Sequence, residues 1–409
     1  MAEAESHGPA RHRNWRMLFS AGHRVFFLSA GLYAIFAMLV WMVWLGVHAA
    51  GGMVSAMPFA PPPHLWHAHE MVFGYPAAAI GGFFLTAVPN WTGARAARHV
   101  FIATAAGLWL AGRVAVWFSG DLPAPLVAAV DLAFLPLLAA KIVTQLMRRP
   151  KPQNLMFLGV LALIWAGNLL VHLDWMGLAG TGDTGLRAGL FATCALIAVL
   201  GGRVAPAFTR NAMLRAGRET RLPTGHAALD AAGIALALAL PAMVLAGLGP
   251  QVTGAVAIGA GAAALARLVL WRPGWTLRQP ILWALHLAYL ALGLGLILTG
   301  LAGLGIGSEV AGLHVLGIGA IGGMTLAVMS RAALGHGGWP LVAPGPVAAA
   351  YGLVALAALA RWAGSSLGLG NYFAGVLVAG GLWILAFTLY TATLWPVFWG
   401  ARPEAGDDA

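Results

Sequence analysis

The residues best suited to chemistry lie in one stretch from His64 to Gly93, which reads HLWHAHEMVFGYPAAAIGGFFLTAVPNWTG. It opens with His64, His67, His69 and Glu70 and continues as an apolar run rich in small residues. Ionisable side chains are costly inside a bilayer, so their presence in an apolar segment tends to mark function. Neutral imidazole is a common ligand of copper, zinc and haem iron. We therefore expect this stretch to bind a metal or haem near one membrane face.

Helical spacing limits how these side chains can cooperate. His67 and Glu70 are three apart and share a face of a regular helix. His69 points about 200° away from His67. One regular helix cannot direct both imidazoles at one metal, so the sequence predicts either two centres or an irregular start after 61–63, which are all proline. Glu70 is the candidate catalytic residue: it either orients a ligand histidine as a hydrogen-bond acceptor or delivers protons to a bound substrate.

The composition requires a membrane protein. Of 409 residues, 60% are hydrophobic and 9% are charged, and the mean hydropathy is +0.82; soluble domains carry about 25% charged residues. About twelve apolar runs approach the roughly 20 residues that a span requires. They cover 24–47, 68–89, 99–118, 122–146, 154–174, 186–208, 226–247, 251–270, 279–303, 309–331, 344–364 and 373–398. The sequence predicts an all-α polytopic membrane protein of about twelve helices, with a tail at 1–23, a transmembrane domain at 24–398 and a tail at 399–409.

Basic residues alternate with the predicted spans. Lysine and arginine precede the first span and occupy the links from two to three, four to five, six to seven and eight to nine. The opposite links contain Asp121, Asp174, Asp183 and Glu309, with Arg187 as the exception. By the positive-inside rule, both termini are cytoplasmic. The net charge of +10 therefore reflects orientation, and no nucleic-acid partner is expected. Arg113 and Asp131 fall inside adjacent spans, and because a buried charge needs a partner we expect them to pair.

The predicted topology sorts the 13 histidines by depth. Those near the outer ends of spans are His48, His64, His67, His69, His172 and His314. A single interfacial histidine usually anchors a helix, but six at one level predict that at least two ligate a metal or haem. His336 lies near the inner end of span ten and is a further metal candidate. The others in basic surroundings are interpreted as solvated or headgroup histidines: His7, His12, His23, His99 and His226.

Polar side chains in the inner half permit two interpretations each. His286 and Tyr289 are three apart on one face, so His286 is either a haem axial ligand or the hydrogen-bond partner of Tyr289. Arg203 and Arg331 lie near inner span ends. Their guanidinium groups either pair with haem propionates or set the topology and contact lipid headgroups.

Several segments resemble the NnrS family of bacterial membrane proteins, which is tied to the nitric oxide response. They are WHAHEMVFGYPAAAIGGFFLTAVPNWTG at 66–93, GGRVAPAFTRN at 201–211, HVLGIGAIGGMTLAVMSRAALGHGG at 314–338 and WALHLAY at 283–289. The resemblance covers nearly the whole chain. It implies a twelve-helix inner-membrane protein that contains haem b and copper and is produced during denitrification or nitrosative stress. The positions carried over as candidates, without assignment to haem or copper, are His67, His69, Glu70, His172, His286, His314 and His336.

The leading functional hypothesis is binding and detoxification of nitric oxide at a His-ligated haem–metal centre near the periplasmic face. In its extended form, the protein reduces two nitric oxide molecules to nitrous oxide, and Glu70 supplies protons. That form needs an electron donor, which the sequence does not identify because it lacks a C-x-x-C-H motif. The alternative is a transporter or copper-handling protein that uses the outer histidines with Met53, Met57 and Met71. A haem-based sensor ranks third because no cytoplasmic signalling domain is evident.

Overall fold

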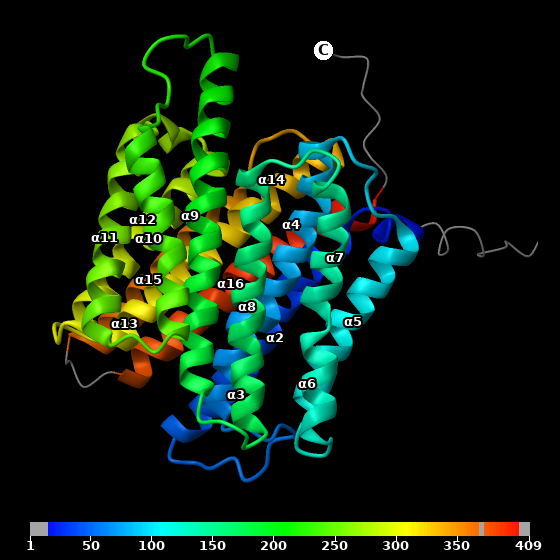
Figure 1. Ribbon diagram of the computed structural model, residues 1–409, viewed down its shortest axis with the longest axis vertical. Helices are drawn as coiled ribbons and strands as arrows, with labels where there is room; N and C mark the ends of the chain where they lie inside the picture. The colour runs from blue at the N-terminus through cyan, green and yellow to red at the C-terminus, as the bar shows by residue number, and fades with distance from the viewer. Residues whose placement is uncertain (1–14, 368–371, 401–409) are drawn as a thin grey trace, which may run out of the picture.

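The computed structural model describes residues 15–367 and 372–400, and every regular element in them is helical (Figure 1). The first half contains α2 (Gly22–Ala49), α3 (Pro63–His69), η1 (Glu70–Gly74), α4 (Tyr75–Thr92), α5 (His99–Trp117), α6 (Ala124–Leu132), α7 (Phe134–Leu146), α8 (Pro152–Trp175) and α9 (Gly182–Arg215). The second half contains α10 (Ala227–Leu245), α11 (Pro250–Leu270), η2 (Pro273–Arg278), α12 (Pro280–Gly303), α13 (Glu309–His314), η3 (Val315–Gly322), α14 (Gly323–Gly337), α15 (Gly345–Ser366) and α16 (Tyr372–Trp399).

The described elements form 12 helical segments long and apolar enough to cross a membrane, which confirms the predicted fold class. Three of them join shorter helices end to end: α3–η1–α4, α6–α7 and α13–η3–α14. The observed ends differ from the predicted ones most at α9, whose 34 residues extend beyond the apolar run at 186–208. At 1.5 Å per residue α9 is about 50 Å long, well over the ~30 Å hydrocarbon thickness. Its last turns project above the neighbouring helices in Figure 1.

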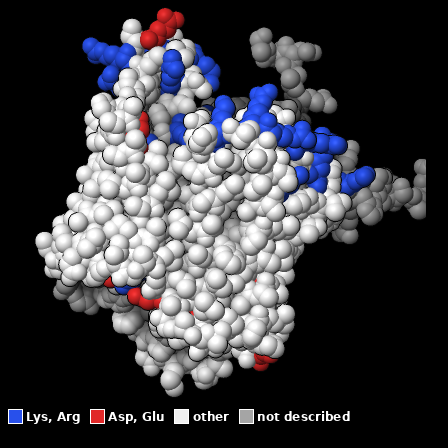
Figure 2. All heavy atoms as spheres, in the orientation of Figure 1, with Lys and Arg blue, Asp and Glu red and all other residues white. Residues whose placement is uncertain are grey.

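The first and last spans meet at one end of the bundle. The Arg24 guanidinium donates hydrogen bonds to the carbonyls of Phe398 and Gly400, at 3.0 and 2.8 Å. Because the number of spans is even, the first span must begin at the same end of the bundle at which the last span ends. Lys and Arg gather at the same end, called the basic end here (Figure 2). The links there carry Arg95, Arg98, Arg148, Arg149, Lys151, Arg218, Arg221, Arg272 and Arg278. The positive-inside rule predicts that this end faces the cytoplasm. The predicted tail residues 1–14 and 401–409 lie outside the described residues.

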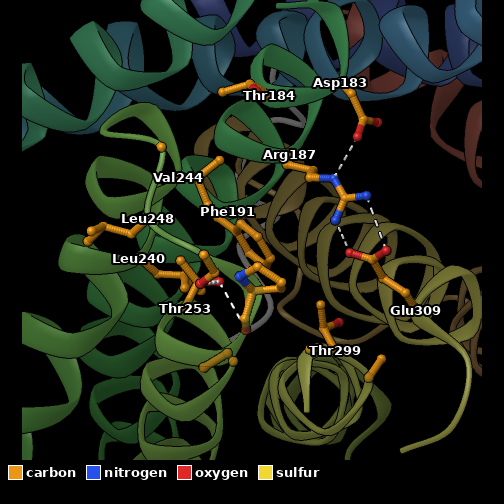
Figure 3. Close-up of a pocket in the computed structure, with 17 residues that line it drawn as sticks. Asp183, Thr184, Arg187, Phe191, Leu240, Val244, Leu248, Thr253, Thr299 and Glu309 are labelled. Carbon is orange, nitrogen blue, oxygen red and sulfur yellow. Dashed lines mark hydrogen bonds and ion pairs between the residues drawn. The ribbon is translucent and has the colours of Figure 1, made fainter. Parts of the chain in front are cut away.

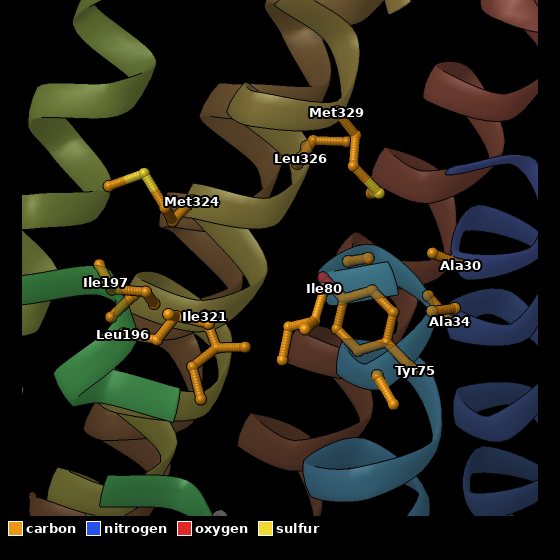
Figure 4. Close-up of a cluster of buried hydrophobic side chains, with 14 of the residues drawn as sticks. Ala30, Ala34, Tyr75, Ile80, Leu196, Ile197, Ile321, Met324, Leu326 and Met329 are labelled. Carbon is orange, nitrogen blue, oxygen red and sulfur yellow. The ribbon is translucent and has the colours of Figure 1, made fainter. Parts of the chain in front are cut away.

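The centre of the bundle is an apolar contact among four spans, drawn in Figure 4. Ala30 and Ala34 of α2 face Tyr75 of α4, while side chains of α9 and α14 close the other side. The Tyr75 hydroxyl is satisfied by Thr325 of α14, so the ring is buried without an orphaned polar atom. Small residues on α2 allow the helices to approach, since lipid supplies no hydrophobic drive for association and close packing must replace it.

Two spans contain π-helical turns, and both lie in segments singled out by the sequence. η1 begins at Glu70, and η3 covers the glycine-rich run Val315–Gly322. A π-turn inserts an extra residue in the helix and rotates the side chains on either side of it relative to each other; such turns are frequent at functional sites. The π-turn η1 follows His67 and His69, which both belong to the regular helix α3, so the expected irregular start after the prolines is wrong.

Backbone-to-backbone contact joins α11 and α12. A Cβ added at Gly261 would lie 2.6 Å from the carbonyl oxygen of Gly293, and one at Gly254 would lie 2.7 Å from that of Gly300. Only glycine fits at such distances, because the nearest atoms belong to the opposing backbone and cannot rotate away.

We predict that Gly261→Leu destabilises the bundle by about 1–3 kcal/mol, because the side chain must separate the two helices. Thermal unfolding of the detergent-solubilised protein measures the change. Gly107→Leu is the matched control, since a Cβ on Gly107 of α5 meets nothing within 4 Å. Equal melting temperatures for the two variants would refute the close contact.

Candidate buried metal centre

Three ionised side chains from three spans meet in the apolar interior. Arg113 of α5 donates from Nη1 to Glu70 Oε2 of η1 at 2.5 Å and from Nη2 to Asp131 Oδ1 of α6. Their exposed fractions are 5% for Arg113, 0% for Glu70 and 6% for Asp131. One guanidinium thus bridges two carboxylates, an arrangement that suits its planar set of donors. The predicted pairing of Arg113 with Asp131 is present, and Glu70 is its second partner.

Two buried histidines extend this network. His69 Nδ1 lies 2.8 Å from Glu70 Oε1, and His69 Nε2 lies 2.8 Å from Asn168 Oδ1. His172 Nε2 lies 2.8 Å from Asp131 Oδ2, which also accepts a hydrogen bond from Asn168 Nδ2 at 2.9 Å. The network links spans two, three, four and five through their side chains. Span one joins through Tyr33, whose hydroxyl donates to Glu70 Oε2.

His69 lies between two hydrogen-bond acceptors. The Asn168 amide must direct Nδ2 at the Asp131 carboxylate, because the reverse orientation would oppose two oxygens. Asn168 Oδ1 then faces His69 Nε2 as an acceptor, and the Glu70 carboxylate faces Nδ1 as an acceptor. The two ring nitrogens of His69 thus contact oxygens from two different spans, while one guanidinium bridges the two carboxylates.

The same side chains form a donor set for a metal ion. One ligand atom from each of His69, Asp131 and His172 lies within 4.8 Å of the other two. Two imidazoles and one carboxylate suit Cu²⁺, Zn²⁺ or Fe²⁺ better than Cu⁺, which favours sulfur. A divalent ion would replace the proton on His69 Nε2. Glu70, bonded to Nδ1, would then hold the ring in the ligating tautomer, the usual role of a carboxylate behind a metal-bound histidine.

Two glycines provide the room that this network occupies. A Cβ on Gly74 would clash with the Glu70 carboxylate and the Arg113 guanidinium. A Cβ on Gly112 would lie 3.0 Å from Asp131 Oδ1 and 3.1 Å from its Cα. The glycines therefore let α5 approach both carboxylates closely enough for one arginine to bridge them.

A cavity of about 240 Å³ leads to the network from the end opposite the basic end. Its lining includes His172, Trp175 and the proline-rich loop at 60–62. The Trp175 ring packs against His69 and His172, with centroids 4.7 and 5.3 Å apart. A small molecule or ion can thus approach His172 from this cavity, while Trp175 and the helices cover the other side.

His67 lies in a separate environment from His69. Its ring stacks on Trp41 at 4.9 Å, and its Nδ1 is buried without a hydrogen-bond partner. His314 and Arg361 lie close enough for their charges to interact with it. His67 and His69 therefore lie in two different environments, and the alternative of two centres stays a prediction. The expected shared face of His67 and Glu70 is not used, because Arg113 and Tyr33 hold the Glu70 carboxylate on the side of His69.

The other candidate histidines are dispersed. His64 is exposed at the start of α3, and His48 contacts Trp44. His336 is exposed at the basic end and contacts His23. His23 itself is 4% exposed, so its interpretation as a solvated histidine is wrong. Its ring packs against Phe27 of α2 and His336 in the last turn of α14.

In the inner half of span nine, His286 and Tyr289 have different hydrogen-bond partners. His286 Nδ1 lies 3.0 Å from the Leu282 carbonyl, and Nε2 lies 3.4 Å from Thr209 Oγ1. Tyr289 instead accepts a hydrogen bond from Arg267 at 2.5 Å, so the alternative in which it pairs with His286 is wrong. The carbonyl fixes a proton on Nδ1 and leaves Nε2 as the nitrogen with a lone pair, as in ligating histidines. His314 is arranged alike, with Nδ1 2.7 Å from the Val310 carbonyl.

The two arginines expected near haem propionates lie apart from the buried network. Arg203 donates to the Gln153 carbonyl at 2.7 Å and to Asn154 Oδ1 at 3.3 Å. Arg331 lies over the Phe208 ring, 4.0 Å from its centroid. Their role toward propionates stays a prediction.

Two large cavities in the described part of the chain are lined without histidine. One of about 500 Å³ lies between α9 and α13, where Arg187 pairs with Asp183 and Glu309 (Figure 3). The other, of about 480 Å³, is bordered mostly by apolar side chains of α12, η3 and α15. Neither offers an imidazole to a haem iron. The geometry therefore fits a metal ion at the buried network better than it fits a haem in either cavity.

Asn168 and Tyr33 are members of the network that sequence reasoning missed. Asn168 is four residues before His172 on α8, so the two share a face. An amide that faces the same side as a candidate ligand in an apolar span was the available signal. Tyr33 carried no such signal, because its contact with Glu70 joins positions 37 apart.

A family model described as NnrS protein matches residues 17–402. The match covers nearly the whole chain, including every member of the buried network. No curated protein matches the chain.

We predict that Arg113→Met destabilises the protein by about 3–5 kcal/mol, because it leaves two buried carboxylates without their shared counter-ion. Arg187→Met is the control: its side chain is 34% exposed and its loss should cost less than about 1 kcal/mol. Unfolding in matched detergent compares the two. A triple variant Arg113→Met, Glu70→Gln, Asp131→Asn should recover part of the loss. Arg113→Met as stable as Arg187→Met would contradict the bridging role.

Proposed function

The chain belongs to the NnrS family, and on this premise we propose that it is a multi-pass protein of the bacterial inner membrane that binds copper and haem b and detoxifies nitric oxide. Family membership ties the chain to the nitric oxide response. The proposed copper site rests on one observation: His69, Asp131 and His172 lie together in the interior, in contact with Glu70 and Arg113. Charged side chains inside a span are retained where they serve function.

Copper is the cofactor whose donors lie together. His69 and His172 supply imidazole nitrogen, and Asp131 supplies a carboxylate oxygen. Bound copper or haem would supply the position at which nitric oxide coordinates and accepts electrons. For haem b, the resemblance retains His286 and His314 as axial candidates, since each directs Nδ1 at a backbone carbonyl. The histidine-free lining of the two large cavities gives no support to a haem there, so no step is assigned to haem.

The residues around the copper donors are arranged to hold and move protons. Glu70 accepts from Tyr33, Arg113 and His69, so it connects span one to the donor set. His69 bears a proton at Nε2 that a metal would displace. Reduction of nitric oxide consumes two electrons and two protons for two nitric oxide molecules and yields one nitrous oxide and one water. Glu70 is the proposed relay for these protons, and an external electron donor must supply the electrons.

The alternative of a copper transporter is less consistent with the site. Met53 is 81% exposed on the loop before α3, whereas His69 and Glu70 are fully buried. Ligands locked by hydrogen bonds from four spans suit retention of a metal rather than its passage. A passing ion would have to break the bridge from Arg113 to Glu70 and Asp131. Each of these buried charges is costly to leave without its partner.

We predict that His172→Gln lowers affinity for Cu²⁺ at least tenfold, because it removes one of three donors. Metal analysis and competitive Cu²⁺ titration of the detergent-purified protein measure this. His226→Gln, an exposed histidine before α10, is the matched control. Equal affinity of the two variants would exclude this donor set.

We also predict that Glu70→Gln slows nitric oxide consumption per bound copper by about 10²-fold, the scale of a lost proton-transfer group. A nitric oxide electrode and nitrous oxide detection, with a chemical reductant present, give the rates. A spectrum of the reduced protein with and without nitric oxide reports binding separately. An unchanged rate in Glu70→Gln would remove its catalytic role, and wild-type protein that binds nitric oxide without forming nitrous oxide would limit the function to binding.

A further inference from the structure

A second pair of histidines lies at the basic end, far from the buried network. His23, in the first turn of α2, faces His336 in the last turn of α14, with ring centroids 5.4 Å apart and planes tilted by 33°. Tyr33, the contact of α2 with the buried network, is ten residues further along, or about 15 Å at 1.5 Å per residue. The two sets of side chains are therefore separate sites on the same bundle.

His23 is buried in an unusual state. It is 4% exposed, and neither ring nitrogen has a hydrogen-bond partner. Leaving a buried polar group unsatisfied costs about 1–3 kcal/mol, and such groups in native proteins commonly mark an ion or water at the site. Two neighbouring side chains give the His23 ring no hydrogen bond. Phe27 is apolar, and the Arg24 guanidinium donates to the carbonyls of Phe398 and Gly400.

The separation of the two rings matches shared coordination of one ion. A metal–nitrogen bond of about 2.0 Å places each ring centroid about 3.2 Å from the metal. Rings on opposite sides of a haem iron would then be about 6.4 Å apart, and rings at a tetrahedral angle about 5.2 Å apart. The observed 5.4 Å corresponds to the bent arrangement. His23 and His336 are thus placed for a metal ion, not as the two axial ligands of a haem.

We infer that His23 and His336 bind a divalent first-row transition-metal ion at the basic end of the bundle. The absence of a carboxylate from the pair disfavours Mg²⁺ and Ca²⁺, which prefer oxygen, and imidazole favours Cu²⁺ and Zn²⁺. His336 is exposed, so the ion can enter from solvent, and water can fill its remaining positions. His23 closes the site from the protein side. The inference uses no residue of the proposed copper centre and stands independently of nitric oxide chemistry.

A Cu²⁺ titration of the full chain in detergent tests this site, after removal of metal with a chelator. His336→Gln is the principal variant, because an exposed residue can be replaced without loss of packing; His23→Gln is the second. His99→Gln is the control, an exposed histidine at the basic end that begins α5. We expect each of the first two variants to bind one Cu²⁺ fewer per chain, or to bind it at least tenfold more weakly. His99→Gln should bind as the wild type does.

Electron paramagnetic resonance identifies the ligands in a His172→Gln background, which removes the other proposed site. Cu²⁺ should then show coupling to two imidazole nitrogens, and addition of His336→Gln should reduce it to one or none. Cu²⁺ binding by His336→Gln and His23→Gln that equals the wild type would overturn the inference. So would loss of haem absorbance, rather than of Cu²⁺, in these variants. Failure of the His172 site alone leaves this signal intact, so the two proposals fail separately.

Discussion

The bridge from Arg113 to Glu70 and Asp131 is the interaction on which the outer half of the bundle depends. A lone arginine or carboxylate in the hydrocarbon region is expensive, and a pair recovers that cost only with close geometry and further hydrogen bonds. Here three spans must approach until one guanidinium reaches two carboxylates, and Gly74 and Gly112 permit that approach. The positions of spans two to four are thereby specified by charge rather than by apolar contact, which is interchangeable with lipid contact.

Helix α3 places its two histidines in different environments. His67 and His69 are two residues apart on this regular helix, so their side chains point about 200° away from each other. His69 contacts Glu70, where the π-turn η1 begins, and His67 stacks on Trp41. The two histidines of one segment thus serve two environments, and the carboxylates of Glu70 and Asp131 lie beside His69.

Proton and metal compete for the same atom at this centre. Without a metal, His69 Nε2 donates a proton to the hydrogen bond with Asn168 Oδ1. A divalent ion in place of that proton changes the buried charge by one unit unless a ligand water or a neighbouring group also loses a proton. Such coupling is a general property of metal sites made from titratable ligands. In an enclosed membrane site it joins metal occupancy to proton movement, which is what a proton-consuming reduction of nitric oxide would use.

The sequence by itself determined the architecture, because composition leaves water-soluble folds no surface and span length is set by the bilayer. It also predicted the pairing of Arg113 with Asp131, since a charge in an apolar run has few partners available. The identity of the centre was decided only by tertiary structure. Asn168 and Tyr33 reach the network from helices that periodicity cannot place, and Arg113, the partner of Glu70, lies 43 residues away on another span. His23, assigned to solvent from its basic neighbours, is buried where the first turn of α2 faces His336 in the last turn of α14, a contact between residues far apart in the chain. Local pattern specifies which residues enter the membrane, whereas contacts between distant spans decide which of them meet.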